Sequence, residues 1–227
     1  MSLTLYFHPF SSYCQKAVLA LYENGTPFTP KVINLGDPAS AGELKKLWPI
    51  GKFPVLRDDA RGETVPESTI IVEYLAQHYS GPVKLVPADP DLARRVRQWD
   101  RFFDLYINDP MAKIVVDNFR PAGKGDPYGV EVARKLLATA YNVLEAHLDG
   151  THWAAGDTFT MADCAASPFL YYANLMMPLA QHPRVSAYYN RLVARPSFQR
   201  ALKEAEPFCK GVPFEADYKT EFARIAK

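Results

Sequence analysis

Short apolar runs and helix-like spacings alternate along the first 80 residues. Residues 3–7 form an apolar and aromatic run that predicts a strand ending at His8-Pro9. The segment Ser12-Tyr13-Cys14-Gln15 has the S-x-x-Q form of a helix capping box, and apolar residues then recur at helical spacing until Asn24-Gly25. A second strand is predicted at residues 28–35 and a polar helix at 41–47. This order of strand, helix, strand and helix indicates a parallel crossover.

A proline-led run, Phe53-Pro54-Val55-Leu56, predicts the next strand. Because proline cannot donate to a central ladder, this residue should lie where the strand begins or at an open edge. Thr64-Val65 predicts an antiparallel partner for residues 55–57, and a helix is expected to open at Glu67-Ser68. The first unit is therefore predicted to end near residue 79.

The pattern changes after the proline- and glycine-containing stretch 80–90, which is typical of a linker. Helical periodicity then dominates and predicts helices at residues 91–119, 128–149, 161–178, 184–194 and 197–205. Thr160-Met161-Ala162-Asp163 has capping-box spacing at the start of one of them, which gives Asp163 a structural role. We expect an α/β domain at 1–79, a linker at 80–90 and an all-helical domain at 91–227.

Composition narrows the class of protein. Of the 227 residues, 48% are hydrophobic and 22% are charged, so there is enough apolar material for a core. With 26 Lys plus Arg against 25 Asp plus Glu and no basic block, nucleic acid is not an expected partner. No apolar run reaches about 18 residues, so no membrane association is expected, and the three scattered cysteines indicate a reducing, cytoplasmic location.

Four local signatures occur in a fixed order along the chain. They are Ser11-Ser12-x-Cys14-x-Lys16, Gly51-Lys52-Phe53-Pro54-Val55-Leu56, Glu67-Ser68-Thr69-Ile70-Ile71, and Gly156-Asp157-x-Phe159-Thr160-Met161-Ala162-Asp163. Together they resemble the cytosolic glutathione transferase family, specifically its serine-type, zeta-, theta- or omega-like bacterial members. The resemblance implies a thioredoxin-like N-terminal domain followed by an all-helical C-terminal domain, in a homodimer.

The two adjacent serines are the first candidates for the chemistry. If Ser12 caps the helix, its oxygen is committed to the Gln15 amide and Ser11 keeps a hydroxyl for the cleft. The resemblance also favours Ser11, because serine-type transferases place the thiolate-activating hydroxyl five residues before a basic residue, here Lys16. We therefore expect Ser11 to be catalytic, although both serines could be simple caps.

The same resemblance implies the remaining glutathione contacts. Phe53 would offer its backbone to the cysteinyl part of glutathione, and the Phe53-Pro54 bond would be cis. Glu67 would pair with the γ-glutamyl ammonium group while Ser68 and free helix amides hold its carboxylate. Lys52 is either a contact of the glycyl carboxylate or a solvated surface lysine.

Cys14 is the rival nucleophile, because a thiol in the first turn of a helix can have a depressed pKa. Related cysteine-type enzymes act as thiol transferases, but their cysteine usually occupies the position of Ser11, so we expect Cys14 to turn inward as a small buried residue. An apolar pocket for the co-substrate is expected from aromatic side chains, namely Phe10, Tyr106, Tyr171 and Tyr172. The five histidines show no metal-ligand spacing, and no metal is expected.

The resemblance thus implies a glutathione transferase that conjugates the glutathione thiolate to small hydrophobic electrophiles. Three alternatives stay open. The enzyme could be a glutathione-dependent isomerase of maleyl-acid type or a thiol-disulfide oxidoreductase acting through Cys14, and the chain could instead be a non-enzymatic ligand-binding protein with the same fold.

Overall fold

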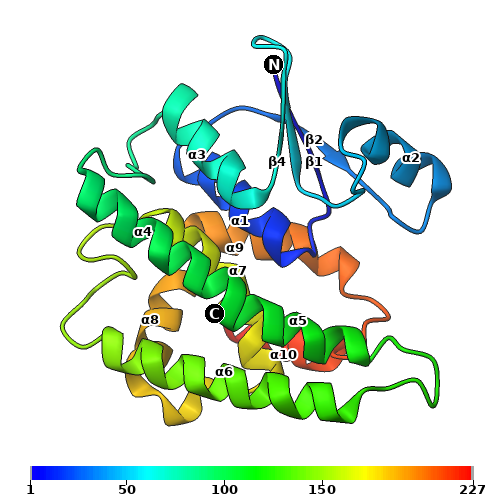
Figure 1. Cartoon of the computed structure of the whole chain (residues 1–227), viewed down its shortest axis with the longest axis vertical. Helices are drawn as coiled ribbons and strands as arrows, with labels where there is room; N and C mark the ends of the chain where they lie inside the picture. Colours follow the sequence, from blue (N-terminus) through cyan, green and yellow to red (C-terminus); the bar gives the residue numbers. More distant parts are fainter. Residues whose placement is uncertain (1, 226–227) are drawn as a thin grey trace.

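The computed structural model describes residues 2–225. Its N-terminal part contains a four-stranded mixed sheet. The strands are β1 (Leu3–Phe7), β2 (Thr29–Val32), β3 (Val55–Asp58) and β4 (Glu63–Pro66), in the spatial order β2-β1-β3-β4 (Figure 1). β1 runs parallel to β2 and antiparallel to β3, and β3 pairs antiparallel with β4. The predicted parallel crossover and the predicted hairpin are both confirmed.

Alternation along β1 explains why helices cover both faces of the sheet. Leu3, Leu5 and Phe7 point to one face and join a large core with α1 (Ser12–Glu23) and α3 (Ser68–His78). Tyr6 points to the other face, where it packs on a small cluster with α2 (Pro38–Leu47). Figure 1 shows α2 on the opposite side of the sheet from α1 and α3.

The second half is helical. It contains α4 (Pro90–Phe102), the π-helical segment η1 (Phe103–Asn108), α5 (Asp109–Asp117), α6 (Pro127–His147), α7 (Met161–Met176), the short turn η2 (Leu179–Gln181), α8 (Pro183–Val193), α9 (Pro196–Ala205), the short turn η3 (Glu206–Phe208) and α10 (Glu215–Ile225). The predicted helices all exist, but the predicted helix at 91–119 is three pieces with a π-helical middle. α10 was not predicted.

α7 lies at the centre of the molecule and joins the two halves. Every residue from Met161 to Ala173 is buried, because α7 packs on α1 of the sheet unit as well as on α4 and α8. Its capping box is present: the Asp163 carboxylate accepts hydrogen bonds from the Thr160 amide at 2.8 Å and from the Ala154 amide at 2.9 Å. Asp163 therefore has the structural role predicted for it.

Membrane-spanning helices and clustered metal ligands are both absent from residues 2–225. None of the helices there is long and apolar enough to cross a membrane. Nor do three or more His, Cys, Asp or Glu side chains gather there as metal ligands would.

Candidate active site

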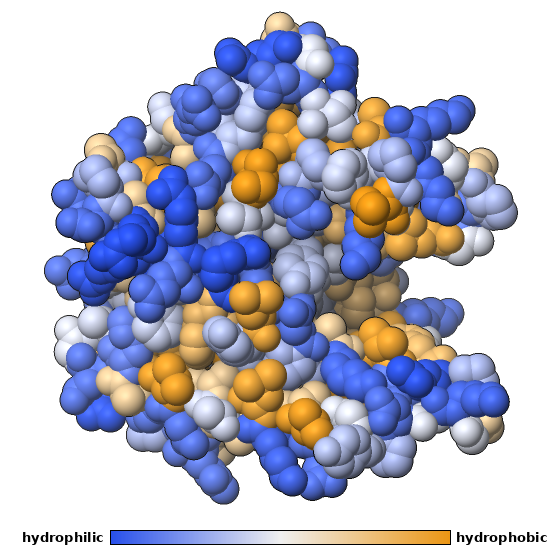
Figure 2. Space-filling model, viewed as in Figure 1, coloured by the Kyte–Doolittle hydropathy of each residue, from blue (hydrophilic) through white to orange (hydrophobic). Residues whose placement is uncertain are grey.

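A cavity of about 450 Å³ lies where the sheet unit meets the helical unit. Figure 2 shows this face of the molecule hollowed between the two units. One wall comes from the first turn of α1, the loop before β3 and the start of α3; the other comes from α4 and η1. The lining residues are Tyr13, Trp48, Lys52, Phe53, Pro54, Glu67, Ser68, Thr69, Ile70 and Glu73 on the first wall, and Arg97, Asp100, Arg101, Asp104 and Leu105 on the second.

The loop before β3 presents backbone groups to this cavity. The Phe53-Pro54 peptide bond is cis, as the resemblance implied. Gly51 lies just before it at φ +70, a conformation that a side chain would strain. The Phe53 ring lies against the His8 ring at the end of β1, with 6.0 Å between the ring centroids. The loop is therefore anchored to the sheet while one of its sides faces the cavity.

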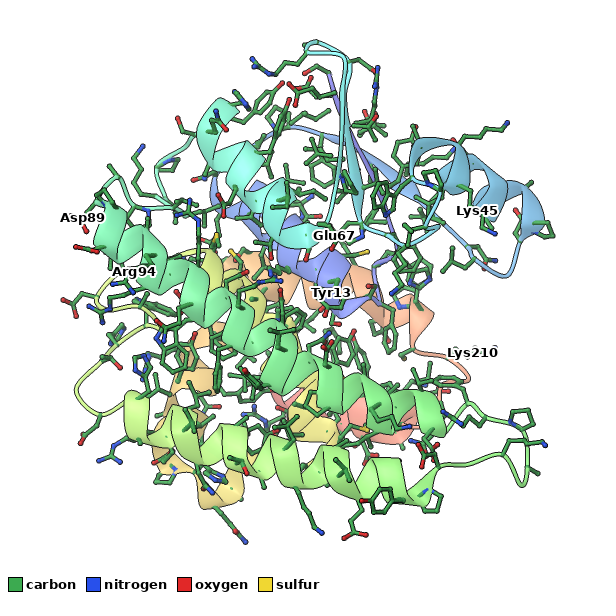
Figure 3. All side chains as sticks on the ribbon, in the orientation of Figure 1. Tyr13, Lys45, Glu67, Asp89, Arg94 and Lys210 are labelled. Carbon is green, nitrogen blue, oxygen red and sulfur yellow. The ribbon has the colours of Figure 1, made fainter. Side chains whose placement is uncertain are left out.

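The start of α3 faces the same cavity. Glu67 precedes the helix at φ 69 and ψ 119, with no side-chain capping hydrogen bond, and Ser68 is buried as the first helical residue. The first amides of a helix have no partner within the helix, so this end attracts negative charge. Figure 3 shows Glu67 at the start of α3 close to Tyr13 at the start of α1, so two helix N-termini border one space.

Known proteins are similar to this chain in sequence and architecture. Residues 5–83 fit the family model for the glutathione S-transferase N-terminal domain, and residues 116–191 fit the model for the C-terminal domain. Glutathione S-transferase 3 of Zea mays is 31% identical over 209 residues, which cover 88% of this chain and 93% of the relative. The chain belongs to the glutathione S-transferase family.

One solved structure and a further sequence relative also match most of the chain. A glutathione S-transferase from Methylobacillus flagellatus KT, solved with GSH bound, has a TM-score of 0.81 and 26% identity, covering 88% of this chain and 98% of that one. Glutathione S-transferase GstB of Escherichia coli K12 is 27% identical over 204 residues, covering 88% of this chain and 97% of the relative. The transferase fold therefore extends over nearly the whole chain, as a thioredoxin-like domain followed by a helical domain.

The helix cap at the transferase's first turn differs from the prediction. The structure makes Ser11, and not Ser12, the N-cap of α1: the Ser11 oxygen accepts from the Cys14 amide at 3.4 Å. The expected capping box fails because the Ser11 amide donates to the His8 carbonyl, so a turn places Ser11 one residue ahead of the helix. The Gln15 side chain turns to the Pro9 carbonyl instead.

The two serine hydroxyls have different partners. A hydroxyl has one donor and two acceptor sites, so accepting from an amide does not use the proton. Ser12 Oγ donates to Asn108 Oδ1 at 2.9 Å, whereas Ser11 Oγ accepts from the Cys14 amide and also lies beside the Cys14 thiol, whose burial-raised pKa it acts to lower. Neither serine is among the residues that line the cavity, although Tyr13, two residues after Ser11, is.

Cys14 turns inward, as expected of a small buried residue. It is fully buried, and its sulfur accepts from the His8 amide at 3.4 Å. Burial raises the pKa of the Cys14 thiol to about 12, although hydrogen bonds from His8 and Ser11 oppose the rise. A neutral, inaccessible thiol is a poor nucleophile.

A buried ionic cluster behind the cavity was missed by the sequence reasoning. Lys16 Nζ lies 2.7 Å from Asp100 Oδ1 and 2.9 Å from Asp104 Oδ1, and it donates to Thr69 Oγ1 at 2.8 Å. Burial lowers the pKa of Lys16 to about 8, while the charge of Asp100 raises it. The sequence signal was two aspartates, four residues apart, inside the aromatic stripe from Trp99 to Tyr106. The cluster links α1 and α3 to the helical wall.

The aromatic co-substrate residues are not brought together at the cavity. Tyr171 and Tyr172 are core residues, 0% and 4% exposed, because α7 is surrounded on all sides; their assignment to an open pocket was wrong. Phe10 packs on Phe214 and Tyr218, and Tyr106 is exposed, so neither lines the cavity. The apolar lining comes instead from Tyr13, Trp48, Phe53, Pro54, Ile70 and Leu105.

Proposed function

We propose that this chain is a glutathione transferase that joins the thiolate of glutathione to a small hydrophobic electrophile. One observation carries the proposal. Lys52, Phe53, Pro54, Glu67 and Ser68, to which the family resemblance gives contacts with different parts of glutathione, all line the same cavity. They come from two separate segments, so their convergence is a property of the fold and not of neighbouring sequence positions.

Each group has a role that its chemistry suits. Glu67 pairs with the γ-glutamyl ammonium group, and Ser68 with the first amides of α3 holds the γ-glutamyl carboxylate. The Phe53 backbone aligns the cysteinyl part in the manner of an added strand. Lys52 meets the glycyl carboxylate. Positioning of this kind supplies much of the rate enhancement for a two-substrate reaction.

Ser11 supplies the thiolate stabilisation. A free cysteine thiol has a pKa near ~8.5, and lowering it by about 2 units takes about 2.7 kcal/mol. A hydrogen bond to a charged group contributes roughly 1.5 to 3 kcal/mol, and a helix N-terminus roughly 0.3 to 2 kcal/mol. The Ser11 hydroxyl at the start of α1 can therefore supply the shift. With an aryl halide, the sulfur forms the new C–S bond and the halide leaves with its electron pair.

Apolar side chains of both walls receive the electrophile. Tyr13, Ile70 and Leu105 offer apolar surface beside the glutathione positions. In this proposal the glutathione-binding domain spans residues 1–79, and the helical domain that completes the co-substrate site spans 91–227. The family resemblance also supports a homodimer.

The test is the change Ser11→Ala, with Ser80→Ala as a matched control in the exposed linker. Conjugation of glutathione to an activated aryl halide should fall by an order of magnitude or more in Ser11→Ala, because the thiol pKa of bound glutathione should rise by about 2 units without the hydroxyl. Ser80→Ala should match the wild type. Unchanged turnover in Ser11→Ala would remove Ser11 from the mechanism.

A glutathione-dependent isomerase is the second candidate, because a probable maleylacetoacetate isomerase of Caenorhabditis elegans is 27% identical over 207 residues. It would use the same thiolate on a different substrate. Turnover of a maleyl-acid at a rate well above that of aryl halides would replace conjugation as the main activity. Binding of glutathione without turnover of either substrate class would indicate a binding protein.

A further inference from the structure

The π-helical segment η1 brings a buried amide to the first turn of α1. A π-helical turn is wider than an α-helical turn and frequently marks a functional site. Here it interrupts the long helix α4–α5, and its last residue, Asn108, is only 1% exposed. Asp104, which contacts Lys16 in the middle of α1, belongs to the same segment.

Two side chains of the first turn of α1 bond to the junction of η1 and α5. Ser12 Oγ donates to Asn108 Oδ1 at 2.9 Å, and the Tyr13 hydroxyl donates to Asp109 Oδ1 at 3.2 Å. Burial raises the pKa of Tyr13 to about 12, while a hydrogen bond with Asn108 opposes the rise. The raised pKa keeps the Tyr13 hydroxyl protonated at neutral pH. Asn108 contacts both Ser12 and Tyr13, the two residues that follow Ser11.

The first turn of a helix needs such support, because its amides lack partners within the helix and helix ends fray. Ser11 itself is held by the bond from its amide to the His8 carbonyl and by the 3.4 Å bond from the Cys14 amide to its side chain. The second of these bonds is long. A shift of the Ser12 backbone would therefore move the Ser11 hydroxyl.

On the basis of the proposed function, we propose that Asn108 is a positioning residue that fixes the Ser11 hydroxyl against the glutathione sulfur by holding Ser12. Asn108 is neutral, so it acts through geometry and not through charge. The charged groups nearby, Lys16, Asp104 and Asp109, remain in place when Asn108 is replaced. The part-buried Asn108–Ser12 bond carries this role, because the Tyr13–Asp109 bond is exposed to water.

The experiment measures the thiol pKa of bound glutathione by ultraviolet titration of its thiolate, which needs binding but no turnover. The variants are Asn108→Ala and Ser12→Ala, which remove either end of the bond, and Ser12→Thr, which keeps the hydroxyl. Asn174→Ala is the control, since the Asn174 side chain accepts a hydrogen bond from the Leu179 amide, elsewhere in the helical domain. Melting temperatures are recorded for all variants.

Asn108→Ala and Ser12→Ala should each raise the thiol pKa by about one unit, which leaves about tenfold less thiolate at neutral pH. The glutathione Kd should stay within about threefold of the wild type, because the anchoring residues are untouched. Combining the two changes should add little to either alone, since both break one interaction. Ser12→Thr and Asn174→Ala should keep the wild-type thiol pKa.

Two results would overturn the proposal. The first is a lower melting temperature in Asn108→Ala with an unchanged thiol pKa, which is what a merely structural residue would give. The second is a further one-unit rise when Asn108→Ala is added to Ser11→Ala, because Asn108 would then act without Ser11. Absence of conjugation by the wild type would refute the proposed function, and the titration would still decide the role of Asn108. Absence of glutathione binding would refute both.

Discussion

Glu67 carries the positive φ at the entrance to α3, and among the non-glycine residues of 2–225 it is the one with this conformation. A backbone of this kind costs of order 1–3 kcal/mol and persists where the surroundings impose it. Here it directs Glu67 into the cavity wall at the point where the free amides of α3 begin. The strain is therefore located in a proposed ligand contact.

Replacing Glu67 by glycine should separate stability from binding. Glycine adopts positive φ without a steric penalty. The change Glu67→Gly should therefore leave the unfolding free energy unchanged or raise it by up to about 1 kcal/mol, and the melting temperature should follow. Glutathione binding should weaken at least tenfold, because a charge-assisted hydrogen bond contributes roughly 1.5–3 kcal/mol. Thermal unfolding and calorimetric titration measure the two effects.

The control for this prediction is Glu63→Gly in β4, where the backbone is ordinary. Glycine in a strand should lower stability by roughly 0.5–1 kcal/mol and leave glutathione affinity unchanged. Equal destabilisation by the two glycines would show that the Glu67 backbone is not strained.

Ser11 and Ser12 show how far single residues could be read from the sequence. The candidate pair was evident, but the capping box was assigned one residue too late. The turn closed by the His8 carbonyl decides the cap, and the partner of Ser12 lies 96 residues away. The spacing of residues in the local sequence shows neither this turn nor the distant partner of Ser12.

At the scale of elements, Asp58 ties the sheet to the C-terminal end of α3. It is fully buried at the end of β3, and its carboxylate accepts hydrogen bonds from the hydroxyls of Tyr74 and Tyr79 and from the Ala60 amide. Burial acts to raise the pKa of Asp58, but these hydrogen bonds lower it below the ordinary value overall. The ionised carboxylate is therefore favoured by folding.

The change Asp58→Asn should destabilise the protein by about 1–3 kcal/mol at neutral pH, because one buried and one part-buried hydroxyl lose their charged acceptor. A depressed folded-state pKa gives stability that is present above the unfolded pKa of about 3.9 and is lost as pH falls through the folded value. The gap between wild type and variant should narrow in acid. Urea unfolding at neutral and acidic pH measures it, and the exposed Asp59→Asn is the control. A gap that does not change with pH would contradict this assignment.

The existence of the helices and strands was predictable where their periodicity was strong, and the hairpin of β3 and β4 was predictable from the polar turn between them. The π-helical segment was not predictable, because residues 103–108 keep an apolar spacing compatible with a continuous helix. α10 was missed because a single fully buried side chain, Tyr218, anchors its short and mostly polar sequence.

At the scale of the whole molecule, Lys16 is a fully buried ionic link between the two domains. It lies at 0% exposure between Thr69 of α3 and the aspartates of α4 and η1, Asp100 and Asp104. Removing one partner of a buried ion pair leaves an uncompensated charge, which costs more than the pair gains. This link also forms the floor of the cavity, because Thr69, Asp100 and Asp104 line it.

Lys16→Met should lower the unfolding free energy by about 3–5 kcal/mol, since two buried carboxylates lose their buried cation and keep only the half-exposed Arg101. Lys31→Met is the matched control, because Lys31 and Glu43 form an exposed pair that contributes roughly 0–1 kcal/mol. Urea unfolding of both variants provides the comparison. Similar losses in the two would mean that the buried cluster does not hold the domains together.

The domain architecture and the first wall of the cavity were predictable from motifs that are each local in sequence. The helical wall was not: none of the predicted co-substrate aromatics lines it, because the placement of α4 depends on buried charges and on packing around α7. Contacts between residues that lie far apart in the sequence leave no pattern in the local sequence.

The two walls of the cavity come from different parts of the chain, and this separation bears on how new substrates can be acquired. Arg97, Arg101 and Leu105 are exposed on one wall, whereas the proposed tripeptide contacts lie on the other. Mutation of the exposed helical positions can change which electrophile is accepted while the nucleophile is still held. A randomised library at Arg97 and Leu105 is therefore the direct route to altered selectivity, because Arg101 also pairs with the buried Asp100 and Asp104; the same route is open to natural selection.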